Sequence, residues 1–594
     1  MCGIFLALDR EHDQLPTPEI QDLLMQRGPD SLQKLAFCLH SKPTDERIRQ
    51  DSPVASEDAG RTTIPKRHDC FVTCLGSVLS LRGSTVTKQP ISDDRKVEDS
   101  ASSFLCWNGE AWSFATSSIR GNDSIHVFNL LSHICQCAWR AGDEHPELAL
   151  AEALSAYAGP YAFTFYDHLY RRIYCGRDFL GRRSLLKKIT ATGVLVSSIP
   201  DNLEDWEEIE ADGVYWVDLD SGNDFCFQRA PYQLSAQSLG SSRSNSSFQL
   251  ELPRQWSSAS RHKDGSARAG DPTECLHRLL VNALLSRICT IPSTSPEPAA
   301  LLDGKPAKLA VLFSGGIDCT VLARLAHETL SPSEPIDLLN VAFENPRIHR
   351  QGKNADLSPY EQCPDRKTAA SSLAELRTSC PGRQWRLLRI NVPYDDFLKH
   401  RPKVISLIRP HNTEMDLSIA SALYFAARGI GLLEDDSPFE TKARVLLSGL
   451  GADELFAGYT RHATAYSRGG FEALQAELAL DISRLGKRNL GRDDRVISHW
   501  AKEARYPFLD EDLIKWALSA SLQEKCGFGD TSPPLDPSGA PLDPAKTVLR
   551  RLALKLGLPR VAQEKKRAIQ FGARTAKMEV KKTKGTQQLT VSAC

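Results

Sequence analysis

The sequence has none of the features that mark membrane-spanning, secreted or nucleic-acid-binding chains. Its 594 residues contain no apolar run near the ~20 residues that cross a bilayer. The first residues, Met-Cys-Gly-Ile-Phe-Leu-Ala-Leu-Asp, lack the basic start and the long apolar stretch of a secretory signal. The formal net charge is −1, which offers no excess charge to nucleic acid or to an acidic membrane. We therefore expect a cytoplasmic protein that binds neither nucleic acid nor membrane.

Zinc-binding motifs are absent from the sequence as well. The 16 cysteines are scattered, and even the closest pair, Cys135 and Cys137, does not form a Cys-x-x-Cys motif. We expect reduced, mostly buried thiols. Cys2 differs, because removal of Met1 makes it the N-terminal residue. Its own α-amino group, with an unperturbed pKa of roughly 7.7–8.0, can then take the thiol proton. Position alone favours the alternative, a cysteine that merely follows the initiator.

The length of the chain predicts roughly two to four domains. In the first 220 residues, short strand-like runs alternate with turn signals, which favours an antiparallel β domain. Amphipathic helices at 125–137 and 148–157 complete an αββα arrangement, and the polar stretch 41–68 is typical of an inserted loop. The strand-like runs lie at 71–81, 104–107, 162–166, 172–175, 193–197 and 213–219.

The composition changes after residue 220. Residues 221–272 are rich in Ser, Gly and charge, so they cannot bury enough apolar surface to fold. We predict a Ser-rich linker there, between a first domain at 2–220 and a second at 273–594. From Lys308 onward, apolar runs alternate with helical patterns. This alternation predicts an α/β doubly wound, mostly parallel sheet that binds ligands at the carboxyl ends of its strands.

Two strand ends of the second domain carry residues suited to phosphate chemistry. The run at 308–313 leads into Ser-Gly-Gly-x-Asp at 314–318. The glycines let the backbone approach a ligand, and the next helix presents its N-terminus to an anion. Asp318 suits such a site if Mg²⁺ bridges it to a phosphate, and Asp453, after the run at 444–449, offers a second carboxylate. The ordinary alternatives are Asp318 as a helix N-cap and Asp453 as an acid at a helix start.

Six motifs follow one another in the first domain. They are Met1-Cys2-Gly3-Ile4, Arg27-Gly28-Pro29-Asp30, Leu81-Arg82-Gly83, Trp107-Asn108-Gly109-Glu110, Asn122-Asp123-Ser124 and Gly176-Arg177-Asp178-Phe179-Leu180-Gly181-Arg182-Arg183. Together they resemble the N-terminal-nucleophile (Ntn) glutaminase domain of class II glutamine amidotransferases. The resemblance implies that Cys2 attacks the carboxamide of glutamine and that Asn108 and Gly109 form the oxyanion hole. It also implies that Arg82 and Asp123 bind the α-carboxylate and α-amino groups of glutamine.

The second domain carries a signature of its own. Its motifs are Gly451-Ala452-Asp453-Glu454-Leu455-Phe456-Ala457-Gly458-Tyr459 and Arg505-Tyr506-Pro507-Phe508-Leu509-Asp510. With the loop at 314–318 they resemble the ATP-pyrophosphatase (PP-loop) fold, and the synthetase domain of glutamine-hydrolysing asparagine synthetases in particular. The stretch Lys566-Arg567-Ala568-Ile569-Gln570-Phe571-Gly572 narrows the resemblance to the asparagine synthetase domain-containing proteins, a divergent eukaryotic branch.

This resemblance implies ATP and Mg²⁺ as cofactors. The residues it assigns to ATP are Phe313, Ser314, Gly315, Gly316, Asp318, Val341, Ser448 and Gly449, and it assigns Mg²⁺ to Asp318 and Asp453. The implied reaction sequence is glutamine hydrolysis, ATP-dependent adenylation of a carboxylate, and amide formation. The implied partners are glutamine and a small carboxylate, aspartate first, with a homodimer as a candidate assembly.

Three positions depart from the synthetases. Leu450 stands where they carry a glutamate that handles the attacking ammonia, and leucine cannot accept a proton. Ala568 replaces a lysine, with Lys566 and Arg567 adjacent as other sources of positive charge. Cys319 replaces the last serine of the loop, which is the mildest change. Three functions stay open: an asparagine-synthetase-like amidotransferase, a ligase for another carboxylate acceptor, and a non-catalytic regulator that retains the fold.

Overall fold

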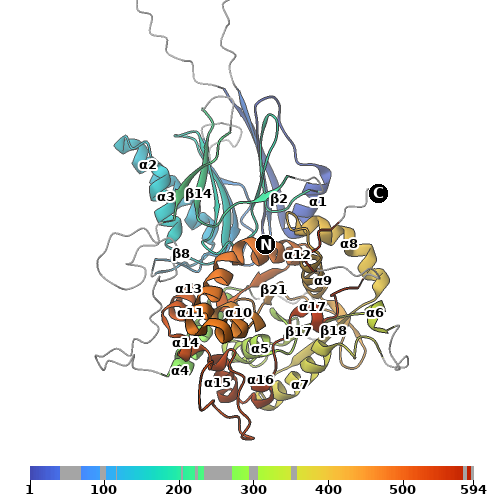
Figure 1. The fold of residues 1–594 in the computed structure, drawn as a ribbon. Coiled ribbons are helices and arrows are strands. Elements are labelled where there is room, and N and C mark those ends of the chain that lie inside the picture. Colours follow the sequence, from blue (N-terminus) through green and yellow to red (C-terminus); the bar gives the residue numbers. More distant parts are fainter. Residues whose placement is uncertain are drawn as a thin grey trace, which may run out of the picture.

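The computed structural model describes residues 1–40, 69–93, 102–115, 117–201, 205–220, 225–232, 271–292, 305–349, 358–578 and 585–589 (Figure 1). The predicted inserted loop at 41–68 lies outside these residues, as does most of the predicted linker. Among the helices described, none combines the length and the apolar composition needed to cross a membrane.

Two antiparallel sheets form the N-terminal part. The strands are β1 (Gly3–Asp9), β2 (Ser31–Leu39), β3 (Cys70–Val78), β4 (Ile91–Ser92), β5 (Phe104–Gly109), β6 (Ser113–Phe114), β7 (Ser117–Ser118), β8 (Tyr157–Ala158), β9 (Tyr161–Asp167), β10 (Arg172–Arg177), β11 (Leu186–Ile189), β12 (Gly193–Ser197), β13 (Glu207–Glu208), β14 (Gly213–Asp218) and β15 (Gln228–Pro231). One sheet has the order β13-β11-β12-β1-β3-β2 and the other β15-β14-β10-β9-β5-β4, with a small third sheet β7-β6-β8.

Helices cover the outer faces of both large sheets. Helix α1 (Pro18–Arg27) packs on β1 and β3, while α2 (Asp123–Ala141) and α3 (Pro146–Ser155) pack on the other sheet. The predicted αββα arrangement is therefore confirmed (Figure 1).

Strand β1 shows why its sequence is apolar without alternation. Ile4, Leu6 and Leu8 point into the core between the sheets, whereas Phe5 and Ala7 point into the core beneath α1. Successive side chains of a strand face opposite ways, so a strand covered on both faces is apolar throughout.

A seven-stranded sheet organises the C-terminal part. Its strands are β16 (Leu309–Leu312), β17 (Ile336–Phe343), β18 (Trp385–Val392), β19 (Ile430–Leu432), β20 (Pro438–Glu440), β21 (Val445–Leu447) and β22 (Glu503–Arg505), in the order β20-β19-β18-β17-β16-β21-β22. Five neighbouring strands are parallel, namely β18, β17, β16, β21 and β22, and β19 and β20 form an antiparallel edge. The predicted doubly wound, mostly parallel sheet is confirmed.

The helices of this part are α4 (Pro272–Ile288), α5 (Ile317–Thr329), α6 (Pro346–His349), α7 (Pro364–Ser379), α8 (Tyr394–Ile408), α9 (Glu414–Arg428), α10 (Ala452–Leu455), α11 (Thr460–Leu485), α12 (Gly491–Ser498), α13 (Glu511–Ser519), α14 (Leu522–Lys525), α15 (Thr547–Lys555), α16 (Pro559–Gln563) and α17 (Ile569–Gly572). A π-helical turn, Gly486–Leu490, joins α11 to α12, and a 3₁₀ turn spans Pro507–Leu509.

The boundary between the two parts differs from the predicted one. Strand β15 lies inside the stretch 221–272 that the composition marks as linker, yet it pairs with β14. The short run Gln-Arg-Ala-Pro gives little apolar signal, because only Ala230 of this edge strand is buried. Helix α4 begins the second part at Pro272, one residue before the predicted boundary.

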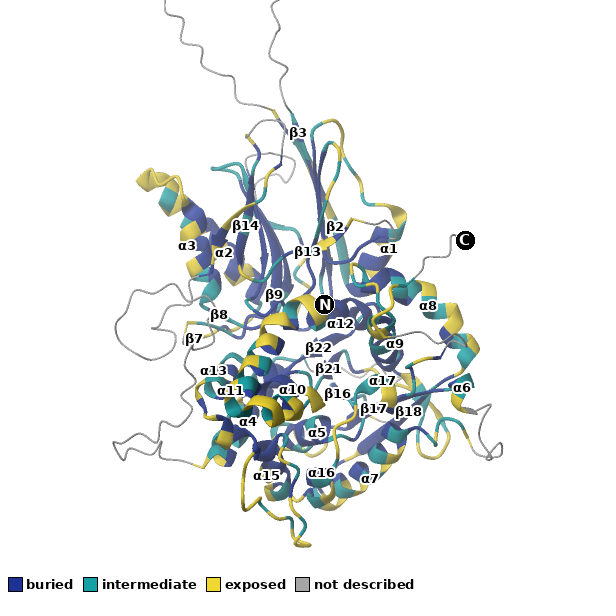
Figure 2. Cartoon of the chain, viewed as in Figure 1, coloured by how far each residue is buried: buried dark blue, intermediate teal, exposed yellow. Residues whose placement is uncertain are grey.

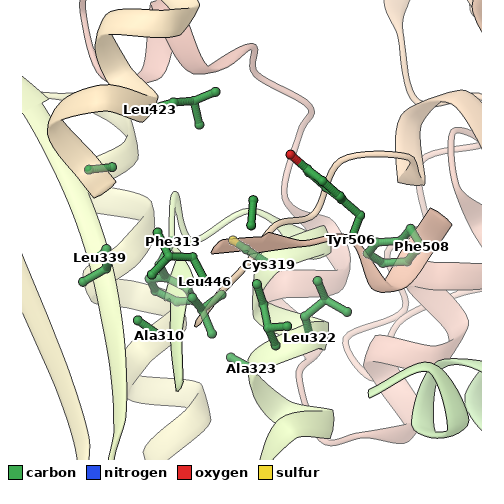
Figure 3. Packing of buried hydrophobic residues seen from close by; sticks show 14 of the residues in the cluster. Ala310, Phe313, Cys319, Leu322, Ala323, Leu339, Leu423, Leu446, Tyr506 and Phe508 are labelled. Carbon is green, nitrogen blue, oxygen red and sulfur yellow. The ribbon is translucent and has the colours of Figure 1, made fainter. Parts of the chain in front are cut away.

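The parallel sheet places a crevice at its centre. Strand β16 has β17 on one side and β21 on the other, and connections run in opposite directions from such a point, leaving room for a ligand at the strand ends. Figure 3 shows Phe313 at the end of β16 close to Leu446 of β21, with Cys319 of α5 beside them.

The two parts meet along a buried seam. Every residue of α12 and of β22 is buried, and Figure 2 shows both elements where the N-terminal sheets rest on the C-terminal part. This seam matters for function because Cys2 lies beside it.

Candidate active sites

Cys2 lies directly before β1, where the first part meets the second. Its carbonyl accepts a hydrogen bond from Arg27 Nε at 2.7 Å. Only glycine fits at Gly3, because a Cβ there would lie 2.5 Å from Ser77 Oγ. The structure includes Met1, so the nitrogen of Cys2 is a peptide nitrogen here, and burial raises the pKa of the thiol to about 11. The use of the α-amino group as a base stays a prediction that requires removal of Met1.

Asn108 and Gly109 end strand β5 near this cysteine. Neither amide atom of Asn108 has a hydrogen-bond partner among the described residues, although the side chain is fully buried. Gly109 packs closely against the neighbouring strand, since a Cβ there would lie 2.5 Å from the carbonyl oxygen of Pro160. Gln89 connects the two places: its Nε2 donates to the carbonyl of Trp107 at 2.9 Å and lies 3.8 Å from Cys2 Sγ. An unpartnered buried donor beside a thiol is what an oxyanion hole requires.

Arg82 and Asp123 both form hydrogen bonds with the backbone of Ala111. Arg82 Nη1 donates to the carbonyl of Ala111 at 2.6 Å, and the N–H of Ala111 donates to Asp123 Oδ2 at 2.8 Å. Trp107 Nε1 donates to the same carboxylate oxygen at 3.1 Å. Burial raises the pKa of Asp123, which the Arg82 guanidinium opposes, and the Asp123 charge in turn raises the pKa of Cys2. The structure therefore brings together all five residues predicted for the glutaminase site.

The second candidate site is a cavity of about 640 Å³ at the carboxyl ends of β16 and β21. The predicted ATP and Mg²⁺ residues that line it are Phe313, Ser314, Gly316, Asp318, Val341, Ser448, Gly449 and Asp453. Gly315 faces away from the cavity. Its φ is +79°, a Cβ there would lie 2.4 Å from the nitrogen of Ala369, and its carbonyl accepts from Ser372 Oγ at 2.7 Å. Gly315 thus shapes the loop by packing against α7.

The two predicted metal carboxylates converge on one cation. Lys546 Nζ lies 2.7 Å from each oxygen of Asp318 and 2.7 Å from Asp453 Oδ1. Lys566 Nζ lies 2.5 Å from the other oxygen of Asp453. Burial alone would raise the pKa of Asp453, but the two ammonium groups hold it well below its usual range. Because the buried ammonium of Lys546 already occupies a cation position between two carboxylates, the donor set fits a divalent ion that shares them with phosphate oxygens.

The departures from the synthetase pattern also lie in this cavity. Leu450 and Ala568 both line it. Lys566, two residues before Ala568, reaches Asp453, so positive charge is present from a shifted position. Glu454, the nearest glutamate along the chain, is buried, accepts a hydrogen bond from Tyr459 at 2.6 Å, and has a pKa raised by burial and by Asp453.

Lys546 and His411 were not predicted from the sequence. Lys546, which contacts the two cavity carboxylates Asp318 and Asp453, follows a proline-rich loop and belongs to no motif that could have identified it. His411 lines the cavity, and its Nε2 is buried without a hydrogen-bond partner among the described residues. Burial, followed by the charge of Arg495, lowers the pKa of His411 to about 4.

Known proteins resemble this chain both in its C-terminal part and over most of its length. A family profile described as asparagine synthase matches residues 305–477 and 464–588. Asparagine synthetase domain-containing protein 1 of Mus musculus is 31% identical, in an alignment that covers 91% of this chain and 95% of that protein. The protein of the same name from Bos taurus is 30% identical, covering 99% and 98%. An asparagine synthetase domain-containing protein of Saccharomyces cerevisiae is 33% identical, covering 85% and 84%.

The profile matches the part that contains the parallel sheet, and the alignments with these relatives cover 85–99% of the chain and so include both parts of the structure. The chain belongs to the family of asparagine synthetase domain-containing proteins.

Proposed function

We propose that this chain is a glutamine-dependent, ATP-consuming carbon–nitrogen ligase of the asparagine synthetase type. The observation that carries the proposal is the presence, in one molecule, of two features: a buried amide without a partner that follows Trp107, whose carbonyl is linked to the Cys2 thiol through Gln89, and two carboxylates at a cavity that converge on one cation. Its reducing location would be the cytoplasm, where free thiols persist.

The first site would release ammonia from glutamine. The thiolate of Cys2 attacks the carboxamide carbon, and Asn108 with the peptide of Gly109 stabilises the oxyanion. The amide nitrogen leaves as ammonia after it takes a proton. Water then cleaves the thioester to give glutamate. Arg82 and Asp123 orient glutamine through its charged α-groups.

The second site would activate a carboxylate. The proposed ATP residues line the cavity around the loop at 314–318, and Asp318 and Asp453 would hold Mg²⁺ against the phosphates. ATP, when bound, would supply AMP as the activating group on the carboxylate with release of pyrophosphate, and ammonia would then displace AMP to form the amide. Lys546 and Lys566 would balance negative charge as the phosphates separate.

Aspartate is the acceptor we propose first, and Leu450 favours two alternatives. A leucine at that place cannot take a proton from the attacking ammonia, which suits a different carboxylate acceptor or a regulator without synthetase activity. Replacing Leu450 by glutamate tests the point directly, because a gain in amide formation would identify this position as the missing proton acceptor.

The deciding assay measures AMP and pyrophosphate released by purified protein with glutamine or ammonia as the nitrogen source, with and without aspartate. We expect turnover with both sources, and Cys2→Ala should abolish only the glutamine-dependent reaction. Absence of turnover from either source, for aspartate and a panel of other carboxylates, would exclude the ligase.

A further inference from the structure

Helix α12 of the second part carries charges that reach into the first. It spans only eight residues, Gly491–Ser498, and all of them are buried, four being Arg or Asp. In Figure 1 it lies between the N-terminal sheets and the parallel sheet. Charged residues are buried in this way only when each has a partner.

Arg27 is the partner that connects α12 to Cys2. Its Nε donates to the carbonyl of Cys2 at 2.7 Å, its Nη1 donates to Ser498 Oγ at 2.6 Å, and its Nη2 donates to Asp494 Oδ2 at 2.5 Å. Both charged side chains are fully buried, with 0% exposure for Arg27 and for Asp494. The Arg27 guanidinium therefore binds the backbone of Cys2 through Nε and binds α12 through Nη1 and Nη2.

Asp494 is fixed in turn by the first part. Its Oδ2 also accepts from the N–H of Ser184 at 3.2 Å, and Arg183 Nη1 lies 3.7 Å from its Oδ1. The carboxylate cannot follow Arg27 to another place without breaking these contacts. It therefore sets where the guanidinium sits, and with it the position of the Cys2 carbonyl.

We propose that Asp494 of the second domain is a positioning residue for the Cys2 nucleophile, acting through Arg27, so that the glutaminase site is complete only with α12 in place. The inference rests on the proposed glutamine hydrolysis. Asp494 hydrogen-bonds to Arg27 and acts on the nucleophile through it. The same helix faces the cavity with Arg492 and Asp493, which makes α12 a wall common to both sites.

The test uses Asp494→Asn in the full-length chain, because this change keeps the volume and removes the charge. We expect kcat for glutamate release to fall roughly 10- to 100-fold, since a nucleophile displaced by about 1 Å loses reactivity on that scale. The KM for glutamine should stay within about twofold, because Arg82 and Asp123 are untouched. Ser498→Ala removes one hydrogen-bond acceptor of Arg27 and no charge, so it should lower kcat by a smaller factor. This milder variant tests the same contact if D494N does not fold.

Asp337→Asn is the matched control. Asp337 is also fully buried, accepts from Arg386 Nε at 2.6 Å and from Thr441 Oγ1 at 2.5 Å, and lies at the parallel sheet away from Cys2. D337N should lower the free energy of unfolding by about as much as D494N does and leave kcat for glutamate release unchanged. If D337N lost as much kcat as D494N, the loss would be a general effect of lower stability, and the positioning role would be overturned.

A second readout follows the thiol itself. Alkylation of Cys2 by iodoacetamide is measured against pH, with the site identified by mass spectrometry. Loss of the Asp494 charge should shift the profile of D494N to lower pH, while the profile of D337N stays with the wild type. The variant would then hold more thiolate and yet hydrolyse glutamine more slowly, which a merely structural role does not produce.

The outcomes separate this inference from the proposed function. Wild-type hydrolysis that D494N retains within about twofold, with an unshifted alkylation profile, overturns the inference and leaves the proposed function standing. A wild type that releases no glutamate contradicts the proposed function, and the alkylation profiles of D494N and D337N still decide whether Asp494 controls the thiol.

Discussion

Replacing Lys546 by methionine removes the ammonium group between Asp318 and Asp453 and keeps a long side chain. At 2.7 Å, a pair of unit charges at an effective dielectric constant of 20 attracts by on the order of 6 kcal/mol. Burial of the lysine offsets much of this, and removing one partner from a buried pair costs about 3–5 kcal/mol. We expect the lower end, about 3 kcal/mol of unfolding free energy, because Asp318 is partly exposed and Lys566 still pairs with Asp453.

The assay is urea unfolding in EDTA and in increasing MgCl₂. With the ammonium gone, Mg²⁺ can take its place between the carboxylates, so K546M should gain more stability from Mg²⁺ than the wild type does. Lys502→Met is the matched control, because Lys502 is buried and donates to the carbonyls of Thr441 and Ala443. The reasoning is refuted if K546M in EDTA unfolds at the wild-type urea concentration, or if Mg²⁺ stabilises K502M to the same extent.

Three further predictions address the two sites and the pH dependence. Asn108→Ala should lower kcat for glutamate release about 10²–10³-fold without lowering the urea midpoint, because its amide has no partner to lose. Gly315→Ala should lower the unfolding free energy by about 2–4 kcal/mol, measured by urea unfolding, because a Cβ at φ +79° would lie 2.4 Å from the nitrogen of Ala369. Burial lowers the pKa of Lys502 from 10.5 to about 8, so the folded state loses this proton first and stability should rise between these pH values; K502M should flatten that rise in unfolding experiments across the range.

Much of the fold could be predicted because its signals are local. The runs that became β5, β9, β10, β12 and β14 are short, apolar and bounded by turn residues. The parallel sheet was likewise evident, because buried parallel strands are continuous apolar runs separated by helical patterns. Strand β15 escaped notice since an edge strand with one buried residue looks like a loop.

The glutaminase residues could be found from sequence because their motifs keep a fixed order. Asn108 and Asp123 have no individual signal, and a surface amide or ion pair is the usual role for such residues. Their ordered neighbours supplied what the residues alone did not. The structure adds that Asn108 is buried without a partner and that Arg82 and Asp123 share Ala111, neither of which a sequence can express.

The interdomain contacts could not be predicted, because their partners are far apart in the chain. Arg27 and Asp494 are separated by 467 residues. The run Gly-Arg-Asp-Asp-Arg of α12 is typical of a solvated helix, since burial of charge is costly without partners. Asp494 and Arg495 of this run have buried partners in the other domain, where Asp494 pairs with Arg27 and Arg495 with Glu208 and Ser184. Lys546 is a similar case, with partners 228 residues away at Asp318.

The glutaminase site and the cavity differ in how completely they keep the residues that catalysis would need. A buried amide without a partner, such as that of Asn108, costs stability on the order of 1–3 kcal/mol. In a regulator that never binds glutamine, this loss of stability would have no compensating function. The first site therefore favours glutamine hydrolysis over a purely regulatory role. The cavity keeps its converging carboxylates and lysines but presents Leu450 where a proton acceptor is expected. The proposed activation of a carboxylate, with a changed final step, accounts for both observations, and the Leu450→Glu variant tests that final step directly.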